Sequence, residues 1–296
     1  MKLVIIGSGG RLGAALMRGY AKEADVIGFN HNQLDLASPA AIENALNGLE
    51  FDALINCAAL TNVDRCETNP EEAFAVNAAA VGQLARICGS KRARCIHIST
   101  DYVFDGEKRE PYTETDSPIP ISVYGESKRQ GEAQLLGASE SNLAVRVSWV
   151  FGPDRPSFVD QILKRAMETE ELQAVGDKWS APTYTLDIVE ALRPLLRETS
   201  VGGVLHIANQ GACTWREYGQ LALDCAAAAG LPLKGRHVAH QAMADLKAFI
   251  AKRPVYTVLG TPRLEAVTGR SLRPWQEAVA DHVQRCYCGS RGHVKT

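Results

Sequence analysis

The chain has 296 residues and a formal net charge of −2, with charged residues of both signs mixed along its length. This length suits one large α/β domain or two smaller ones, and the lack of a basic stretch argues against nucleic-acid binding. The first apolar run, in MKLVIIGSGG, is too short for a membrane span, and it lacks the cleavage-type end of a signal peptide. We therefore expect a cytoplasmic protein that binds neither nucleic acid nor membrane.

Strand and helix patterns alternate through the first half of the chain. Near-continuous apolar runs predict strands buried on both faces, at 2–7, 25–29, 51–60, 93–99 and 142–150. Helical patterns lie between these runs, at 11–23, 39–46, 70–89 and 122–136. This alternation predicts an α/β fold with a doubly wound parallel sheet of the Rossmann type.

The pattern changes after about residue 150, where proline and glycine become frequent. We expect a dinucleotide-binding domain over 1–150 with a returning segment at 171–198, and a smaller C-terminal α/β substrate lobe from 151–170 and 199–296. Thr214 and Glu217 form a capping-box pattern that predicts a helix start in this lobe. Because open α/β sheets bind ligands beyond the carboxyl ends of their strands, the lobe should close a cleft there.

The stretch GSGGRLG joins the first predicted strand to the first predicted helix. It places Gly7, Gly10 and Gly13 three residues apart, with Leu12 at the position that makes the motif GxxGxxG rather than GxGxxG. Glycines there permit a tight turn, close approach of a pyrophosphate and close helix–strand packing. Between a strand and a helix, the motif predicts a dinucleotide cofactor.

The type of cofactor depends on the tip of the second strand. An acid at that tip would bind the ribose of NAD, whereas a basic residue would favour a 2′-phosphate. Asn30 and His31 occupy the tip, and Arg11 in the glycine loop could reach a 2′-phosphate. These residues favour NADPH, with NADH possible.

A possible reaction centre lies in YGESKRQ. Tyr124 and Lys128 are four residues apart and share one face of the predicted helix. Thr100 ends the fourth predicted strand, so all three should meet near the nicotinamide. A free tyrosine has a pKa of about 10, and we expect the lysine and the cofactor charge to lower it. Tyr124 could then donate a proton to a ketone oxygen.

Four stretches resemble the extended short-chain dehydrogenase/reductases, and among them the dTDP-4-dehydrorhamnose reductases. They are NCAALTNVDRCETNPEEAFAVN, STDYVFDG, PYTETDSPIPISVYGESKRQGE and RVSWVFG, which lie in this order between positions 56 and 152. The resemblance implies reduction of the C4 ketone of dTDP-4-dehydro-L-rhamnose by NAD(P)H.

The resemblance also implies roles for single residues. Tyr124, Lys128 and Thr100 match the catalytic set. The positions that match cofactor contacts are Asp35, Leu36, Ala58, Ala59 and Thr61. The positions expected to face the sugar nucleotide are Val63, Asp101, Tyr102, Phe104 and Trp149.

Two arginines, Arg146 and Arg253, are candidates for pairing with a diphosphate, although a structural ion pair is the alternative for each. Trp149 could equally be a core residue at a strand end. The resemblance is thinner on the substrate side, where Lys178, Ser180, Tyr256, Thr257 and Gly260 depart from the usual family pattern.

Three other functions stay open at this stage. The chain could reduce another deoxysugar nucleotide, or it could be a cofactor-binding regulatory subunit like the β subunit of methionine adenosyltransferase. An epimerase or dehydratase is less consistent with the sequence, because only Asp101 supplies a carboxylate near Thr100.

The sequence favours no metal site. The eight cysteines are scattered, which predicts reduced thiols rather than disulfides. Cys286 and Cys288 lie near His282 and His293, but their spacing does not match a zinc site, so we expect a solvated tail. Ala15 stands where some family members carry a glutamate for a metal-bridged dimer. A monomer or another homodimer is therefore expected.

Overall fold

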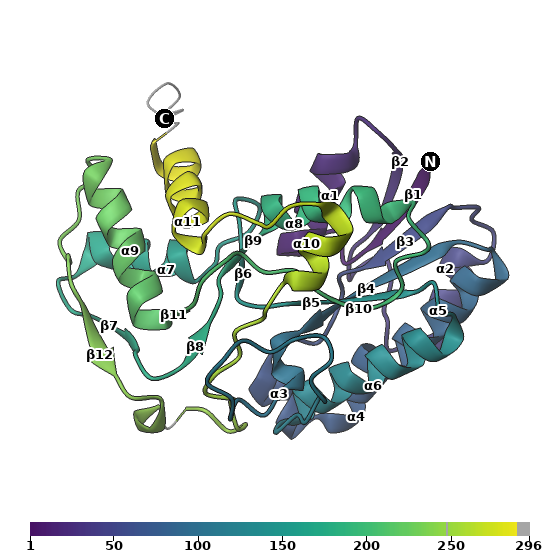
Figure 1. Ribbon diagram of the computed structural model, residues 1–296, viewed down its shortest axis with the longest axis horizontal. Helices are drawn as coiled ribbons and strands as arrows, with labels where there is room; N and C mark the ends of the chain where they lie inside the picture. The colour runs from purple at the N-terminus through teal and green to yellow at the C-terminus, as the bar shows by residue number, and fades with distance from the viewer. Residues whose placement is uncertain (247, 289–296) are drawn as a thin grey trace.

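The computed structural model describes residues 1–246 and 248–288. A six-stranded parallel sheet with the order β10-β5-β4-β3-β1-β2 occupies the right-hand part of Figure 1. Its strands are β1 (Lys2–Ile6), β2 (Asp25–Phe29), β3 (Ala53–Asn56), β4 (Arg94–Thr100), β5 (Leu143–Val147) and β10 (Gly203–His206). The strand order reverses at β1, which lies between β2 and β3. The expected Rossmann-type fold is confirmed.

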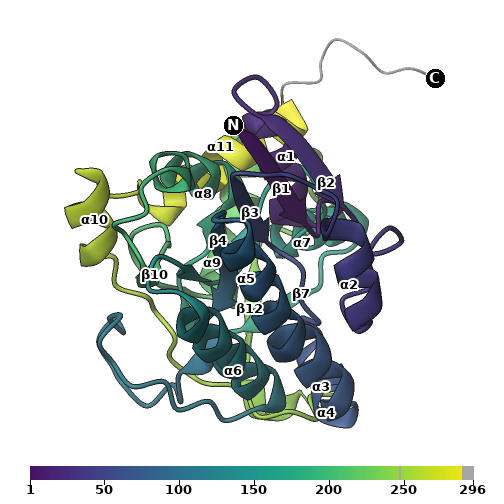
Figure 2. The ribbon, with the colours of Figure 1, turned by 90° about the vertical axis from the view of Figure 1, so that its right-hand side faces the viewer.

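Helices cover both faces of this sheet. On one face, α1 (Arg11–Tyr20) and α8 (Thr185–Leu192) pack against the apolar side chains of β1, β3 and β5. On the other face, the core includes residues of α2 (Pro39–Leu46), α5 (Ala80–Ser90) and α6 (Val123–Ala138). Helices α5 and α6 run side by side in Figure 2. Burial on both faces explains why the strand sequences are almost entirely apolar.

The helix predicted over 70–89 is interrupted. It consists of α4 (Pro70–Phe74), a π-helical turn η1 (Ala75–Ala79) and α5, and it follows the short helix α3 (Val63–Thr68). Asn77 lies in the π turn and is fully buried. Its side chain bonds to both backbone polar groups of Leu60 and donates to Ser127 Oγ at 3.0 Å. The turn therefore ties the loop after β3 to helix α6, as π turns near functional sites often do.

The smaller lobe is built from three two-stranded sheets and three helices. The sheets pair β6 (Val150–Phe151) with β9 (Thr183–Tyr184), β7 (Leu172–Val175) with β12 (Val238–Gln241), and β8 (Trp179–Ser180) with β11 (Cys213–Thr214). The helices are α7 (Phe158–Glu168), α9 (Trp215–Ala228) and α11 (Trp275–Val283), on the left of Figure 1. The predicted capping box of Thr214 and Glu217 is confirmed at the start of α9.

The domain boundaries differ from those expected. Strand β10 falls within 199–296, yet it pairs with β5 and forms the edge of the large sheet. Helix α10 (Pro262–Thr268) joins the same part, since Leu264 belongs to the core of that sheet. Conversely, β7 lies in the expected returning segment but pairs with β12 of the smaller lobe. The two parts are therefore built from interleaved segments of the chain.

The described end of the chain is ordered against the smaller lobe. Residues 284–288 continue α11 as the π turn η5 (Gln284–Cys288), and Tyr287 donates a hydrogen bond to Asp160 at 2.8 Å. The expectation of a solvated tail is therefore wrong for these residues, because Tyr287 and Cys286 pack on α7 and α11. His293 lies outside the described residues. Within the described part, no group of three or more His, Cys, Asp or Glu side chains could hold a metal, and no helix is long and apolar enough to cross a membrane.

Candidate active site

A cleft of about 1140 Å³ lies at the carboxyl ends of the sheet strands. Most of the predicted site residues line it, and they come from the ends of five strands and from the loops and helices that follow them. These residues are Gly7, Gly10, Arg11, Leu12, Asn30, Asp35, Leu36, Ala58, Ala59, Thr61, Val63, Thr100, Asp101, Tyr102, Tyr124, Lys128 and Trp149. Gly13, Phe104 and Arg253 do not line the cleft.

The glycine loop leaves room for an anionic group. Gly7 has a φ of +80°, and a Cβ added there would lie 2.8 Å from the Ala58 backbone nitrogen. A Cβ at Gly13 would lie 2.1 Å from Gly7 O, so Gly13 serves close packing of α1 rather than ligand contact. Gly10 precedes α1 and supplies no side-chain cap to its first turn. Gly7, Gly9 and Gly10 line the cleft as a cradle without side chains, and the free N–H groups of the first turn of α1 fit a dinucleotide pyrophosphate there.

Arg11 does not have the role that the sequence suggested. Its guanidinium donates hydrogen bonds to the backbone oxygens of Val150 (3.2 Å) and Arg155 (3.3 Å) and to that of Pro156. The side chain thus reaches across to the segment after β5 instead of to the tip of β2. Because each of its three nitrogens donates to a carbonyl after β5, Arg11 links the glycine loop to the smaller lobe.

Helix α6 fixes the position of Tyr124. Ser122 caps the helix by accepting a hydrogen bond from Gly125 N at 3.2 Å, and Ser127 Oγ bonds to Tyr124 O at 2.9 Å. The Tyr124 ring is 9% exposed and meets the Tyr102 ring edge to face at 5.6 Å between centroids. Its place on the first turn of α6 directs the phenol into the cleft.

Lys128 is fully buried beside Tyr124 and has two close contacts. Its Nζ donates to Ile98 O at 2.7 Å and lies 2.8 Å from His97 Nε2. Asn56 in turn contacts His97 Nδ1 at 3.1 Å. Burial lowers the pKa of Lys128 to about 7. His97 and Asn56 were not among the residues predicted from the sequence, although a histidine inside the apolar run RCIHIS was a usable signal.

The pKa of Tyr124 is shifted in the direction opposite to that expected. Burial raises it above the ordinary tyrosine value, while the nearby Thr100 hydroxyl lowers it. The expected effect of Lys128 is absent from this balance, because its amino group points to His97 and Ile98 and its charged form is disfavoured by burial. In the protein chain alone, Tyr124 is therefore a protonated donor.

Asp101 is the centre of a buried hydrogen-bond cluster behind Thr100. Its carboxylate accepts from Thr257 Oγ1 (2.5 Å), Ser180 Oγ (3.1 Å) and Thr100 Oγ1 (3.1 Å). Lys178 is also buried, with its Nζ 5.0 Å from the Tyr102 ring centroid. Burial raises the pKa of Asp101, whereas the Lys178 charge lowers it. Two residues that depart from the usual family pattern, Ser180 and Thr257, thus bond to one carboxylate, and a third, Lys178, acts on it through its charge while its ammonium donates to Pro254 O.

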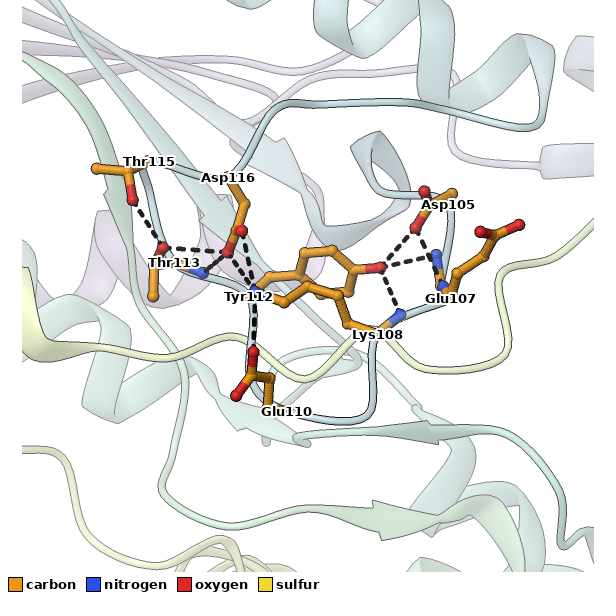
Figure 3. Close-up of polar contacts among 9 residues, drawn as sticks. Asp105, Glu107, Lys108, Glu110, Tyr112, Thr113, Thr115 and Asp116 are labelled. Atoms are coloured by element: carbon orange, nitrogen blue, oxygen red, sulfur yellow. Dashed lines mark hydrogen bonds and ion pairs between the residues drawn. The ribbon is translucent and has the colours of Figure 1, made fainter.

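Phe104 lies behind the site and does not reach the surface of the cleft. It is fully buried and stacks on Tyr112 with 4.1 Å between ring centroids. Figure 3 shows that the Tyr112 hydroxyl bonds to Asp105 (2.6 Å), while Lys108 pairs with Asp116 at 2.9 Å. This network holds the long loop between β4 and α6. The expected contact of Phe104 with a sugar nucleotide is not supported, since the apolar segment turns inward here.

Trp149 lies both in the cleft and against the core of the smaller lobe, the two alternatives that the sequence left open. It lines the cleft, and its ring also packs against Trp215 and Tyr218 of α9. Its backbone φ of +39° is unusual for a residue other than glycine. Its buried Nε1 has no hydrogen-bond partner within the described residues. A strained backbone and a free donor at a cleft are typical of a ligand contact.

Both candidate arginines form ion pairs inside the protein. Arg146 is buried and bonds twice to Glu132, with distances of 2.9 and 2.7 Å. Arg253 bonds twice to Asp64 of α3, at 3.1 and 2.7 Å. The structural alternative therefore holds for each, and neither guanidinium is placed to bind a diphosphate.

Comparison with known proteins adds an independent line of evidence. The family model described as "RmlD substrate binding domain" matches residues 1–288. A dTDP-4-dehydrorhamnose reductase from Mycolicibacterium smegmatis is 36% identical over 286 residues, which are 95% of this chain and 85% of that protein. A probable dTDP-4,6-dihydroxy-2-methyloxan-3-one 4-ketoreductase from Streptomyces antibioticus is 34% identical, over 95% of this chain and 94% of that protein.

A solved structure is similar over almost the whole chain. The crystal structure of a dTDP-4-dehydrorhamnose reductase from Bacillus anthracis in complex with NADP has a TM-score of 0.90 at 27% identity. The match covers 96% of this chain and 99% of that one.

Proposed function

This chain belongs to the family described as the RmlD substrate binding domain, and we propose that it is an NADPH-dependent reductase of dTDP-4-dehydrorhamnose. The observation that carries this proposal is the convergence of Tyr124, Thr100 and Lys128 at one end of a cleft whose other end is a glycine cradle. The product would be dTDP-L-rhamnose. NADH is an allowed second cofactor.

Different residues at the cofactor end of the cleft would bind different parts of the dinucleotide. The glycine loop and the first turn of α1 would hold the pyrophosphate, and Asp35 and Leu36 would lie beside the adenosine. Ala58, Ala59 and Thr61 would line the dinucleotide on the β3 side. When bound, NADPH supplies the hydride for the reaction.

At the other end, the chain supplies the proton and the orientation of the ketone. Tyr124 is protonated in its buried position and would donate to the carbonyl oxygen as that oxygen becomes a hydroxyl. Thr100 would hydrogen-bond to the same oxygen. Val63, Asp101, Tyr102 and Trp149 would contact the sugar nucleotide.

A different 4-keto sugar is the second candidate substrate. The relative from Streptomyces antibioticus carries the name of another 4-ketoreductase and is 34% identical. Ser180 and Thr257 bond to Asp101, and Lys178 lies over the Tyr102 ring. These three residues depart from the usual family pattern and lie behind two positions expected to face the sugar, which supports this candidate. A regulatory subunit remains the alternative outside catalysis, but it would not need the three reaction residues to meet in the cleft.

The decisive experiment supplies the purified chain with dTDP-4-dehydrorhamnose and either NADPH or NADH. We expect stoichiometric consumption of NADPH and formation of dTDP-L-rhamnose, detected by nicotinamide absorbance and product analysis. Retention of the nucleotide in a recycled form would point to an epimerase. No consumption of either cofactor, with a copurifying protein partner, would point to the regulatory subunit.

For the setting and assembly, we propose a cytoplasmic monomer or homodimer. All eight cysteines are free in the structure, which suits a reducing compartment. Ala15 is 1% exposed and faces the core of the sheet, so a metal bridge through this position is disfavoured.

A further inference from the structure

We propose that Arg155 recognises the 2′-phosphate of NADPH. The inference rests on the proposed use of NADPH, and it assigns to Arg155 the role that the sequence had suggested for Arg11. Arg155 belongs to the segment between β6 and α7, far from the glycine loop in sequence. Its side chain is exposed and lines the cofactor cleft.

Arg155 lies next to the tip of β2 and the glycine loop. A Cβ added at Gly9 would lie 3.3 Å from Asn30 Cβ and 3.7 Å from Arg155 Nη2. Asn30 directly follows β2, and the tip of this strand is where a Rossmann fold binds the ribose that carries the 2′-phosphate. Gly9 has no side chain, so it leaves space for the guanidinium beside Asn30.

The Arg155 guanidinium is free to bind a ligand, in contrast to the other basic side chains that line the cleft. The lysine and arginine side chains that line the cleft are Arg11, Arg65, Lys128 and Arg155. Arg11 and Lys128 donate to backbone oxygens, and Arg65 pairs with Glu72 at 2.7 Å. Within the described part of the chain, the Arg155 guanidinium alone among the four has no acceptor. A phosphate fits this fork-shaped donor well.

Contacts with α1 hold the backbone around Arg155 in place. Arg11 Nε donates to the Arg155 carbonyl at 3.3 Å, and Arg18 of α1 forms an ion pair with Asp154. Both contacts anchor the segment to the helix that follows the glycine loop. Such anchoring reduces the entropy lost when the side chain binds a ligand.

The charge at the tip of β2 also favours a phosphate. Asn30 is neutral, and its side-chain oxygen accepts from Asn32 N at 3.0 Å. Asp35 lines the same end of the cleft, but its carboxylate accepts from Ala37 N at 2.9 Å. An acid that would repel a 2′-phosphate is therefore not found directly after β2, and Arg155 supplies the complementary charge.

The test is calorimetric binding of three probes to the full chain: 2′,5′-ADP, ADP and 5′-AMP. For Arg155→Ala, we expect affinity for 2′,5′-ADP to fall about 10- to 100-fold while affinities for ADP and AMP stay unchanged. Arg155→Lys should recover part of the loss. Arg197→Ala removes an exposed arginine outside the cleft and should change nothing.

Two results would overturn the inference. One is unchanged binding of 2′,5′-ADP to Arg155→Ala, and the other is an equal loss for ADP, which would assign the guanidinium to the pyrophosphate. Since no sugar is present, the result is independent of the reductase activity. Wild-type chain that binds 2′,5′-ADP but reduces no 4-keto sugar would refute the proposed function and leave this inference standing.

Discussion

The Nε2 atom of His97 lies 2.8 Å from the Nζ atom of Lys128, and both side chains are buried. Asn56 Oδ1 accepts from Ala58 N at 3.0 Å, so its Nδ2 faces His97 Nδ1 and donates to it. The proton of a neutral His97 then lies on Nε2, directed at Lys128. Burial also keeps the pKa of His97 low. The contact is satisfied when Lys128 accepts as a neutral amine, which agrees with its lowered pKa.

The first prediction concerns the pH dependence of stability. The folded pKa of Lys128 is about 7 and its ordinary value is 10.5, so the unfolded chain binds an extra proton between these values. Stability therefore rises with pH across this window, by at most about 1.4 kcal/mol per pH unit. Urea unfolding of the cofactor-free chain from pH 7 to 10 should show this rise relative to Lys128→Met. Parallel curves for the two proteins would contradict the lowered pKa.

The second prediction concerns the proton donor. Tyr124→Phe removes the phenol oxygen but keeps the ring that packs against Tyr102. We expect kcat to fall by roughly 10²- to 10⁴-fold, the usual contribution of a general acid. Fluorescence titration should find NADPH binding within about twofold of wild type, since the glycine loop is untouched. A variant that kept most of its activity would show that another group supplies the proton.

The third prediction concerns the cofactor cradle. Gly7→Ala places a Cβ 2.8 Å from the Ala58 backbone and forces a non-glycine residue to a φ of +80°. We expect a loss of more than about 1 kcal/mol of unfolding free energy, together with weaker NADPH binding. Gly137→Ala in α6 is the matched control, because a Cβ there meets nothing within 4 Å. The control should be neutral or stabilised by up to about 1 kcal/mol.

Local patterns in the sequence were sufficient to predict five of the six strands of the large sheet and the edge at which most predicted site residues lie. Uninterrupted apolar runs indicated strands buried on both faces, and the topology then brought Thr100, Tyr124 and Lys128 to one edge. Side-chain pairing was not accessible in this way. Arg11, Arg146 and Arg253 each bind partners more than ten residues away, and sequence spacing carries no information about which acceptor an arginine finds.

The boundaries between the large-sheet part and the smaller lobe could not be predicted from local sequence patterns either. The apolar run of β10 resembles any other buried strand, and its place beside β5 follows from pairing across about 60 residues. The π turn at Asn77 was missed for a related reason. Its stabilising contacts are with Leu60 and Ser127, which only the folded chain brings close.

The fourth prediction concerns the cluster behind the substrate wall. Lys178→Met removes the buried ammonium that faces Tyr102 and donates to Pro254 O, and with it the charge that lowers the pKa of the Asp101 carboxylate. We expect a loss of roughly 3 kcal/mol of stability and a higher KM for the sugar nucleotide, with NADPH affinity unchanged. The double variant Asp101→Asn/Lys178→Met should lose less stability than the sum of the single variants. Additive losses would show that the two side chains do not interact.

The fifth prediction concerns the link between α3 and the segment before Arg253. Asp64 accepts from the backbone nitrogens of Ile250 and Ala251, each at 2.9 Å, and pairs with Arg253. These contacts lower the pKa of Asp64 to about 2. Their contribution is present above the ordinary carboxyl pKa and is lost as the pH falls from about 4 towards 2. Asp64→Asn should weaken the link at neutral pH, because the amide cannot pair with Arg253 in the same way.

Hydrogen exchange is the direct measurement of this link. In Asp64→Asn, the amides of Ile250 and Ala251 should exchange faster than in wild type. Because Val63 lines the cleft next to Asp64, the KM for the sugar nucleotide should rise while NADPH affinity stays constant. Arg253→Met tests the ion pair without altering the two backbone bonds to Asp64, so its amides should stay more protected than those of Asp64→Asn. Equal exchange in all three proteins would show that Asp64 does not hold the segment.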